Sequence, residues 1–354
     1  MQNLFIRKYS ISKVLIAYFA AIIFLIAAIF AGISIGAVRV PAGDIFYMMG
    51  GKFLSGSRGY EPDPMYLNIV FNIRLPRVVL AGLVGASLAI AGAAFQGLLR
   101  NPLADPYTLG VSSGASVGAV FTLFYQLSLP GAGLYTLPLL SILSAFVTIL
   151  IVISFARSVD RSMKVETIIL TGIIFSSFLG ALISLMIALS GEELRQIIGW
   201  LLGSVAMRGW SYVRIILPFL LAGSMVLLLN TRELNAIAFG EERAQYLGVN
   251  VAARKFAVLG AGSMITGAAV AVSGTIGFVG LVIPHLARLL WGPDHKHLLP
   301  LSMLVGAGFL ILTDLTARTI IEPAELPIGV ITALIGAPVF AYILLRRRKE
   351  RSGG

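Results

Sequence analysis

The chain has 354 residues, of which 58% are hydrophobic and 12% are charged, and its formal net charge is +11. A soluble domain carries about 25% charged residues, so this composition predicts an all-α protein that crosses a membrane many times. The Lys and Arg residues lie between apolar runs rather than in one basic patch, which argues against a nucleic-acid partner. Cysteine is absent, which excludes disulfides and cysteine-ligated metal or iron–sulfur sites.

The first apolar run covers residues 14–38 and follows Arg7, Lys8 and Lys13. It is longer than the ~7–15 apolar residues of a cleaved signal peptide. We therefore expect an uncleaved first span with its basic flank in the cytoplasm.

The second run, Val78–Leu99, is uncharged and lies between Arg77 and Arg100. As a helix it is long enough to cross the ~30 Å core of a bilayer. Small residues recur along one of its faces, and such faces let membrane helices pack closely. The residues of this small face are Gly82, Ala86, Ala89 and Ala93.

Further apolar runs complete the chain, and together they predict about ten spans in a single transmembrane domain over residues 1–354. The expected spans are roughly 14–38, 78–99, 107–128, 135–156, 167–190, 212–230, 256–273, 275–290, 298–317 and 327–345. A sharp turn around Ser273–Gly277 is expected to divide the long uncharged run in the last third of the chain. An even number of spans puts both termini on one side. Placing them in the cytoplasm gives the inner side, with both tails included, about twice as many Lys and Arg residues as the outer side, in agreement with the positive-inside rule.

The sequence contains no pattern for nucleotide binding or nucleophilic catalysis. Its one Gly-Lys pair, Gly51-Lys52, lacks the earlier glycine and the following Ser or Thr of a phosphate-binding loop. A chain driven by ATP therefore needs a separate ATPase subunit. His295 and His297 have no third ligand nearby in the sequence, so we interpret them as solvated polar residues. We expect a transport subunit without enzyme activity, metal or cofactor.

Asp314 is the clearest acidic residue inside an expected span, and a proton-coupled secondary transporter would need such a group. Arg318 lies four residues later on the same side of the helix, so an ion pair near the outer helix end is the favoured interpretation. A structural or assembly protein is a further alternative, but it would not need long small-residue helix faces.

The largest inner segment, about residues 231–255, is rich in helix formers and small apolar residues. It predicts two short amphipathic helices around Gly240, the second of which ends at Gly248 with a positive φ. A docking site for a cytoplasmic partner explains this segment better than a plain surface loop. Its expected apolar contacts are Ala238, Ala244, Leu247 and Val249.

Four motifs in order carry a resemblance to a known family. They are R-L-P-R…Q-G-L-L-R-N-P-L-A-D-P…L-G-V-S-S-G-A (74–115), G-E-E-R-A-Q-Y-L-G-V (240–249), S-G-T-I-G-F-V-G-L-V-I-P-H-L-A-R (273–288) and E-L-P-I-G-V-I-T-A-L-I-G-A-P-V-F (325–340). From about Arg74 onward, the chain resembles the permease subunits of ABC importers for iron-siderophores, haem and cobalamin, the FecCD-type family.

The resemblance implies a type II ABC importer permease in the cell membrane, paired with a second permease copy or a close paralogue. It also implies ATPase subunits on the cytoplasmic side and an extracytoplasmic solute-binding protein on the other. The implied cargo is a bulky metal chelate, with a ferric siderophore expected first and haem or cobalamin as alternatives. The absence of a His, Asp and Glu ligand cluster in the expected spans agrees with a cargo that arrives already chelated.

The resemblance further implies three sites. The coupling loop that inserts into the ATPase corresponds to the inner segment, with Gly240, Glu241, Arg243, Ala244, Leu247 and Gly248. A cytoplasmic gate corresponds to Asn101, Pro102 and Leu103, for which a simple helix stop is an equal alternative.

The third implied site is the docking of the binding protein, where arginines matching Arg74, Arg77 and Arg318 receive a glutamate from each of its lobes. These arginines lie at the outer ends of their expected spans, against the positive-inside bias. Arg74 and Arg77 have no acidic partner nearby in the sequence. Because guanidinium groups form bidentate bonds to carboxylates, docking is favoured over contact with lipid headgroups.

Overall fold

The computed structural model describes residues 11–36, 38, 40–48, 63–161 and 163–352. Apart from an isolated bridge between Ile321 and Ala324, the regular structure of these residues is helical. In chain order the elements are α1 (Ile11–Ser34), α2 (Ala42–Phe46), α4 (Pro64–Asn68), the π-helix η2 (Ile69–Arg74), α5 (Leu75–Leu98), α6 (Val111–Phe124), the 3₁₀-helix η3 (Gly133–Tyr135), α7 (Thr136–Val159), α8 (Val165–Leu189), α9 (Leu194–Leu201), α10 (Gly209–Leu229), α11 (Thr231–Ala238), α12 (Glu241–Tyr246), α13 (Val251–Ser273), α14 (Val279–Trp291), α15 (His295–Thr319) and α16 (Ile328–Ser352).

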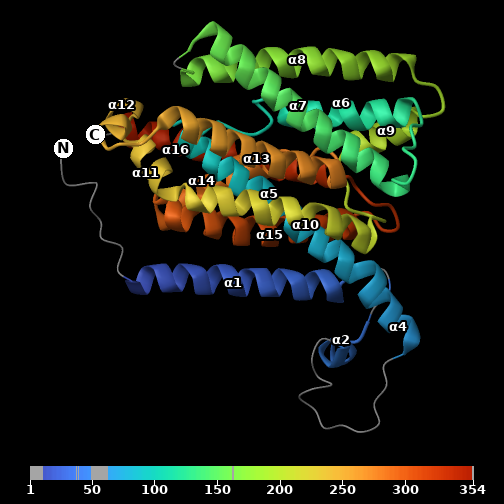
Figure 1. The fold of residues 1–354 in the computed structure, drawn as a ribbon. Helices are drawn as coiled ribbons and strands as arrows, with labels where there is room; N and C mark the ends of the chain where they lie inside the picture. The colour runs from blue at the N-terminus through green and yellow to red at the C-terminus, as the bar shows by residue number, and fades with distance from the viewer. Residues whose placement is uncertain (1–10, 37, 39, 49–62, 162, 353–354) are drawn as a thin grey trace.

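A helix corresponds to each of the ten expected spans, which confirms the all-α membrane architecture. Among the described residues, seven helical segments are long and apolar enough to cross a membrane, and shorter apolar helices cover Val111–Phe124, Val279–Trp291 and Ile328–Tyr342. The long helices lie side by side in one bundle (Figure 1). We call the end where α1 begins and α16 ends the terminal end, and it also carries α11 and α12. The far end carries α2, α4 and α9.

Two spans begin later in the structure than the sequence predicts, because their first residues form irregular backbone. Gly110 and Phe278, which precede α6 and α14, have φ angles of 81° and 68° and therefore cannot continue a helix. The turn expected at Ser273–Gly277 is present. The backbone N–H of Ile276, in the segment before α14, donates to the hydroxyl of Tyr107, in the segment before α6, at 2.6 Å. The bond thus links the two irregular segments and gives this N–H the hydrogen-bond partner that non-helical backbone buried in a membrane protein requires.

The second span extends further back than predicted, since α4 and η2 run directly into α5 and make one helical segment from Pro64 to Leu98. The sequence suggested a loop before Arg74. Pro76 lacks a backbone N–H and cannot complete the regular hydrogen-bond ladder, and the wide π-helical turn just before it accommodates this break.

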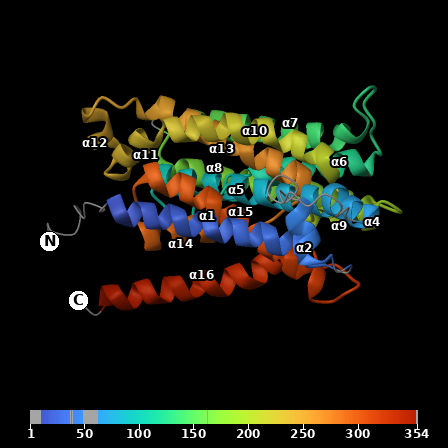
Figure 2. The ribbon, with the colours of Figure 1, turned by 90° about the horizontal axis from the view of Figure 1, so that it is seen from below.

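Helix α5 is the centre of the bundle and is buried along nearly its whole length. It packs against α10, α13, α14 and α15, whereas α1 lies at the periphery mainly on α15 (Figure 1). Figure 2 shows α16 along the edge of the bundle, where it packs on α14 and α15. The predicted small face is used, because Gly82 and Ala89 lie against α15.

Glycines let the backbones of α5 and its two neighbours touch. A Cβ atom at Gly92 would lie 1.9 Å from the carbonyl oxygen of Gly280 on α14, and one at Gly85 would lie 2.2 Å from that of Gly306 on α15. No side chain can move aside at these contacts, because backbone meets backbone. Any substitution must therefore push whole helices apart.

We predict that Gly92→Ala destabilises the folded protein, by about 1–3 kcal/mol, the usual cost of overpacking a close contact. The measurement is the thermal unfolding midpoint of the purified protein in detergent. Gly260→Ala is the matched control, because it adds the same methyl group to a helix at a position where nothing lies within 4 Å. Equal midpoints for both variants would contradict the close approach of α5 and α14.

Candidate functional sites

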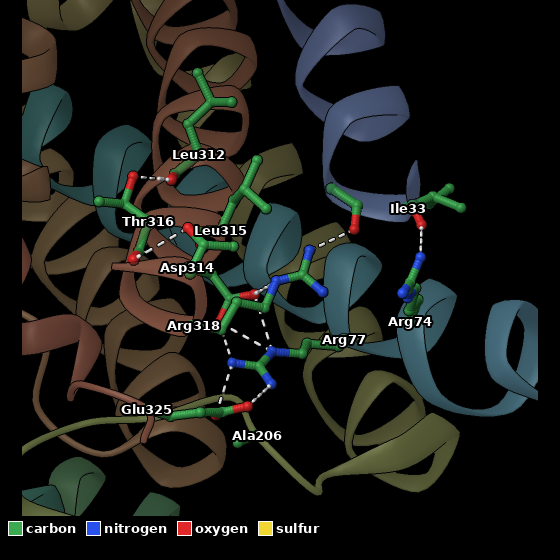
Figure 3. Close-up of polar contacts among 12 residues, drawn as sticks. Ile33, Arg74, Arg77, Ala206, Leu312, Asp314, Leu315, Thr316, Arg318 and Glu325 are labelled. Carbon is green, nitrogen blue, oxygen red and sulfur yellow. Dashed lines mark hydrogen bonds and ion pairs between the residues drawn. The ribbon is translucent and has the colours of Figure 1, made fainter. Parts of the chain in front are cut away.

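At the far end, α5 and α15 bring Arg77 and Arg318 close to two carboxylates, and Arg74, the last residue of η2, lies beside them (Figure 3). Arg77, in the first turn of α5, reaches Asp314 on α15 and Glu325 in the loop before α16. Its Nε donates to Asp314 Oδ1 and Oδ2 at 3.1 and 3.0 Å, and its Nη2 donates to Oδ1 at 2.9 Å. Its Nη1 and Nη2 also donate to Glu325 Oε1 and Oε2 at 2.8 and 3.0 Å. Two carboxylates thus hold one guanidinium.

The two carboxylates sit in different surroundings. The Asp314 side chain is 1% exposed, whereas the Glu325 side chain is 43% exposed. Removing the partner of a buried charge costs about 3–5 kcal/mol, but an exposed pair contributes only about 0–1 kcal/mol. Hydrogen bonds from Arg77 lower the pKa of Glu325, so this pair persists at neutral pH and is lost only as the pH falls through that lowered pKa. We conclude that Asp314 is a fixed partner of Arg77 and Glu325 an exchangeable one.

The other two arginines are tied to the end of α1. Arg318 Nε lies 3.9 Å from Asp314 Oδ2, and its Nη2 donates to the carbonyl of Gly32. Arg74 is 4% exposed and donates to three backbone carbonyl groups, in the manner of a basic residue capping a helix C-terminus. Its acceptors are Ile33 at 2.7 Å, Ser34 at 3.1 Å and Val38.

The expected pair of Asp314 with Arg318 is present, but the closer partner of Asp314 is Arg77, which lies 237 residues away in the sequence. The role of Glu325 was not predicted. Its motif was noted, but the sequence carries no signal that its carboxylate returns to α5. Counting both carboxylates, the cluster of five charged side chains keeps a net charge of +1.

At the terminal end, the inner segment forms the two predicted short helices, α11 and α12, on either side of Gly240. Gly240 and Gly248 have φ angles of 120° and 84°, and Gly248 ends α12 as predicted. The N–H groups of Gly248 and Val249 donate to Gln245 and Ala244 carbonyls at 2.9 and 3.0 Å, which is the hydrogen-bond pattern of a Schellman motif.

One face of this segment packs inward and the other carries exposed apolar side chains. Ala244 is fully buried, as expected, but Leu247 is 74% exposed rather than a contact within the chain. Tyr246 and Phe239 are exposed by 90% and 62%. Arg243 is exposed as well. Large apolar groups exposed together at the end of a bundle are typical of a surface that binds another protein.

Polar links that sequence reasoning missed hold this segment to the bundle. Lys255, at the start of α13, is 1% exposed and donates at 2.7 Å both to Glu241 Oε2 on α12 and to the carbonyl of Met163 between α7 and α8. Asn235 of α11 accepts from the His295 backbone N–H at 2.9 Å and donates to Asp294 Oδ1 at 2.7 Å. Hydrogen bonds therefore fix α12 to α13 and α11 to the start of α15.

The predicted gate residues lie in the turn after α5. Arg100 has a φ of 49°, so α5 ends before Pro102, and Asn101 Oδ1 then accepts a hydrogen bond from the Leu103 N–H at 2.9 Å in an Asx turn. The Leu103 side chain is 46% exposed. Asp105, which sequence reasoning also missed, lies buried in the same loop, and burial raises its pKa to about 6.

The two histidines that we interpreted as solvated polar residues have partners within the protein, and His295 is only 3% exposed, so that interpretation is wrong for His295. His295 Nδ1 lies 2.7 Å from Asn235 Oδ1, and His297 Nδ1 lies 3.4 Å from the Tyr18 hydroxyl. Across the described part of the chain, no group of three His, Asp or Glu side chains is placed to hold a metal ion.

Comparison with known proteins places this bundle in a family. Residues 23–346 match the model of the FecCD transport family. An uncharacterized ABC transporter permease of Bacillus subtilis is 62% identical over 94% of both chains. A cobalamin import system permease of Halobacterium salinarum is 45% identical over 80% of this chain and 75% of its own. Among solved structures, an inward-facing metal-chelate type ABC transporter shares 34% identity with a TM-score of 0.81, covering 93% of this chain and 98% of its own.

The family match, over residues 23–346, includes both the far-end charge cluster and the α11–α12 segment. The relatives are permease subunits of ABC transporters with multi-pass membrane folds. The chain belongs to the FecCD transport family.

Proposed function

We propose that this chain is the transmembrane permease subunit of an ATP-driven importer, with its terminal end in the cytoplasm. A separate ATPase subunit binds the α11–α12 segment, and a solute-binding protein delivers cargo to the far end. The observation that carries this proposal is the α11–α12 segment itself. Its inner face is held by Lys255 and Asn235, while Phe239, Tyr246 and Leu247 remain exposed for a partner.

The cargo we propose is a bulky metal chelate, with a ferric siderophore as the first candidate and haem or cobalamin as alternatives. The structural neighbour is a metal-chelate type ABC transporter, which supports metal chelates as the class of cargo. The similarity to the cobalamin permease of H. salinarum supports cobalamin as one alternative. A secondary transporter is less well supported, because Asp314, its best candidate for a proton-carrying group, is paired with Arg77. A second copy or paralogue would complete the pathway about a two-fold axis, the commonest symmetry of protein oligomers.

The ATPase contact is tested by Leu247→Arg. Leu247 is 74% exposed, so the variant should fold and insert normally, but a charge in an apolar interface should abolish copurification of the ATPase and stop uptake. Leu134→Arg, at a 77% exposed position of the far end, is the matched control and should retain the ATPase. Normal ATPase recovery and uptake with Leu247→Arg would exclude this segment as the coupling site.

For docking, we propose that a carboxylate of the binding protein takes the place of Glu325 on Arg77, while Asp314 stays bound. Reversing Arg77 or Arg318 to Glu is a poor test, because either change also leaves a buried carboxylate without its cation. Replacing Glu325 is a better test. The replacement frees the exposed side of the Arg77 guanidinium and raises the net positive charge of the cluster.

We expect Glu325→Gln to tighten the binding of the cognate solute-binding protein by roughly two- to five-fold, which is the effect of one exposed ion pair. Added salt should weaken binding in both forms. The readout is the dissociation constant at low and high ionic strength. Glu322→Gln, the same change in the same loop, is the control and should have a smaller effect. If neither Glu325→Gln nor added salt changes the dissociation constant, contact of the arginines with lipid headgroups is the better explanation.

The gate is tested with cysteines, for which this cysteine-free chain has no background. Leu103→Cys is the better of the two single variants, because Leu103 is half-exposed and Asn101 is used in the Asx turn. If two copies meet at this turn, the cysteines should crosslink in the closed state and separate when nucleotide opens the gate. Identical crosslinking, or none, in every nucleotide state would leave the turn as a helix stop only.

A further inference from the structure

A groove at the terminal end of α1 is not used by any of the sites above. It has a volume of about 250 Å³ and lies where α1, α14 and α15 meet. Its floor is formed by the buried Ala17 and Leu301, and its open sides by Ile16 and Leu290, which are 66% and 68% exposed. Apolar cavities of ~150 Å³ already take up benzene. In a membrane-spanning bundle, this peripheral groove is large enough for part of an acyl chain.

Polar groups sit at one edge of the groove. Lys13, in the first turns of α1, is exposed and lines it together with Trp291 and His297. The exposed Lys296 precedes His297. His297 uses Nδ1 toward the Tyr18 hydroxyl, which leaves Nε2 free to donate to a phosphate oxygen. Trp at the boundary between apolar and polar surface is typical of the membrane interface.

The electrostatics at this edge favour an anion. Both α1 and α15 begin here with N-termini of positive partial charge, while α14 ends here at Trp291 with Arg288 in its last turn. The acidic neighbour, Asp294, already accepts hydrogen bonds from Asn235 Nδ2 at 2.7 Å and from the Lys296 N–H at 3.0 Å. Basic pockets between transmembrane helices on the cytoplasmic side are known to bind anionic lipid headgroups.

We infer that this groove binds one anionic phospholipid. The acyl chain lies over Ala17 and Leu301, and the phosphate lies between Lys13 and His297. The site does not depend on the importer function, since it needs only a membrane around the bundle. One anionic phospholipid thus occupies the groove between α1 and α15 at the terminal end.

The test is native mass spectrometry of the full-length protein, purified in neutral detergent and titrated with phosphatidylglycerol or phosphatidylcholine. We expect one phosphatidylglycerol to be retained in preference to phosphatidylcholine. Lys13→Ala should lower its affinity about five-fold, the factor that corresponds to ~1 kcal/mol per basic residue near a membrane surface. Lys164→Ala, an exposed lysine at the start of α8 on the same membrane face, is the control and should leave affinity unchanged.

A second variant separates the groove from the charge. Ala20 lines the groove and is exposed, so Ala20→Phe fills the space without disturbing the buried packing of α1. It should displace the bound lipid while leaving the thermal unfolding midpoint in lipid-free detergent unchanged. Equal retention of the two lipids, or full retention of phosphatidylglycerol by both Lys13→Ala and Ala20→Phe, would overturn the inference.

Discussion

Between α5 and its neighbours α14 and α15, backbone meets backbone at Gly92–Gly280 and Gly85–Gly306. In a membrane the lipid tails are as apolar as the helices, so helices associate through close packing rather than through hydrophobic exclusion from water. These contacts fix the distance of α14 and α15 from the central helix. Both ends of the molecule depend on α15, because it takes part in the charge cluster at one end and in the α11–α12 attachment at the other. The packing of α15 against α5 therefore sets the positions of both.

The ion pair of Arg77 with Asp314 is the second fixed point. Asp314 is buried, and burying its charge is tolerable only because Arg77 contributes three hydrogen bonds and Arg318 adds a nearby positive charge. The same arginine therefore cannot leave α15 to meet a partner. A carboxylate from another protein can reach only the side of the guanidinium that Glu325 covers. If the proposed docking at Arg77 takes place, it is therefore limited to an exchange of one carboxylate for another.

Features set by local sequence were predictable, and features set by contacts across the chain were not. Runs of apolar residues bounded by charges gave the spans, and Gly248 and the Asn101–Pro102 pair gave correct helix ends because their conformational preferences are local. The late start of α14 was missed because it depends on a hydrogen bond from Ile276 to Tyr107, far away in the sequence. The Arg77–Glu325 and Lys255–Met163 links were missed for the same reason.

Helix α15 joins the two ends of the molecule. At the terminal end, Asn235 of α11 accepts a hydrogen bond from the backbone N–H of His295, the first residue of α15. Asn235 also donates one to the carboxylate of Asp294, the N-cap of α15. At the far end, the same helix carries Asp314 and Arg318. Pro300 lies inside α15 near its start, and the Gly85–Gly306 contact holds the helix against α5. Because one helix carries both attachments, the packing of α15 on α5 sets the positions of the α11 contact and of the Arg77–Asp314 pair together.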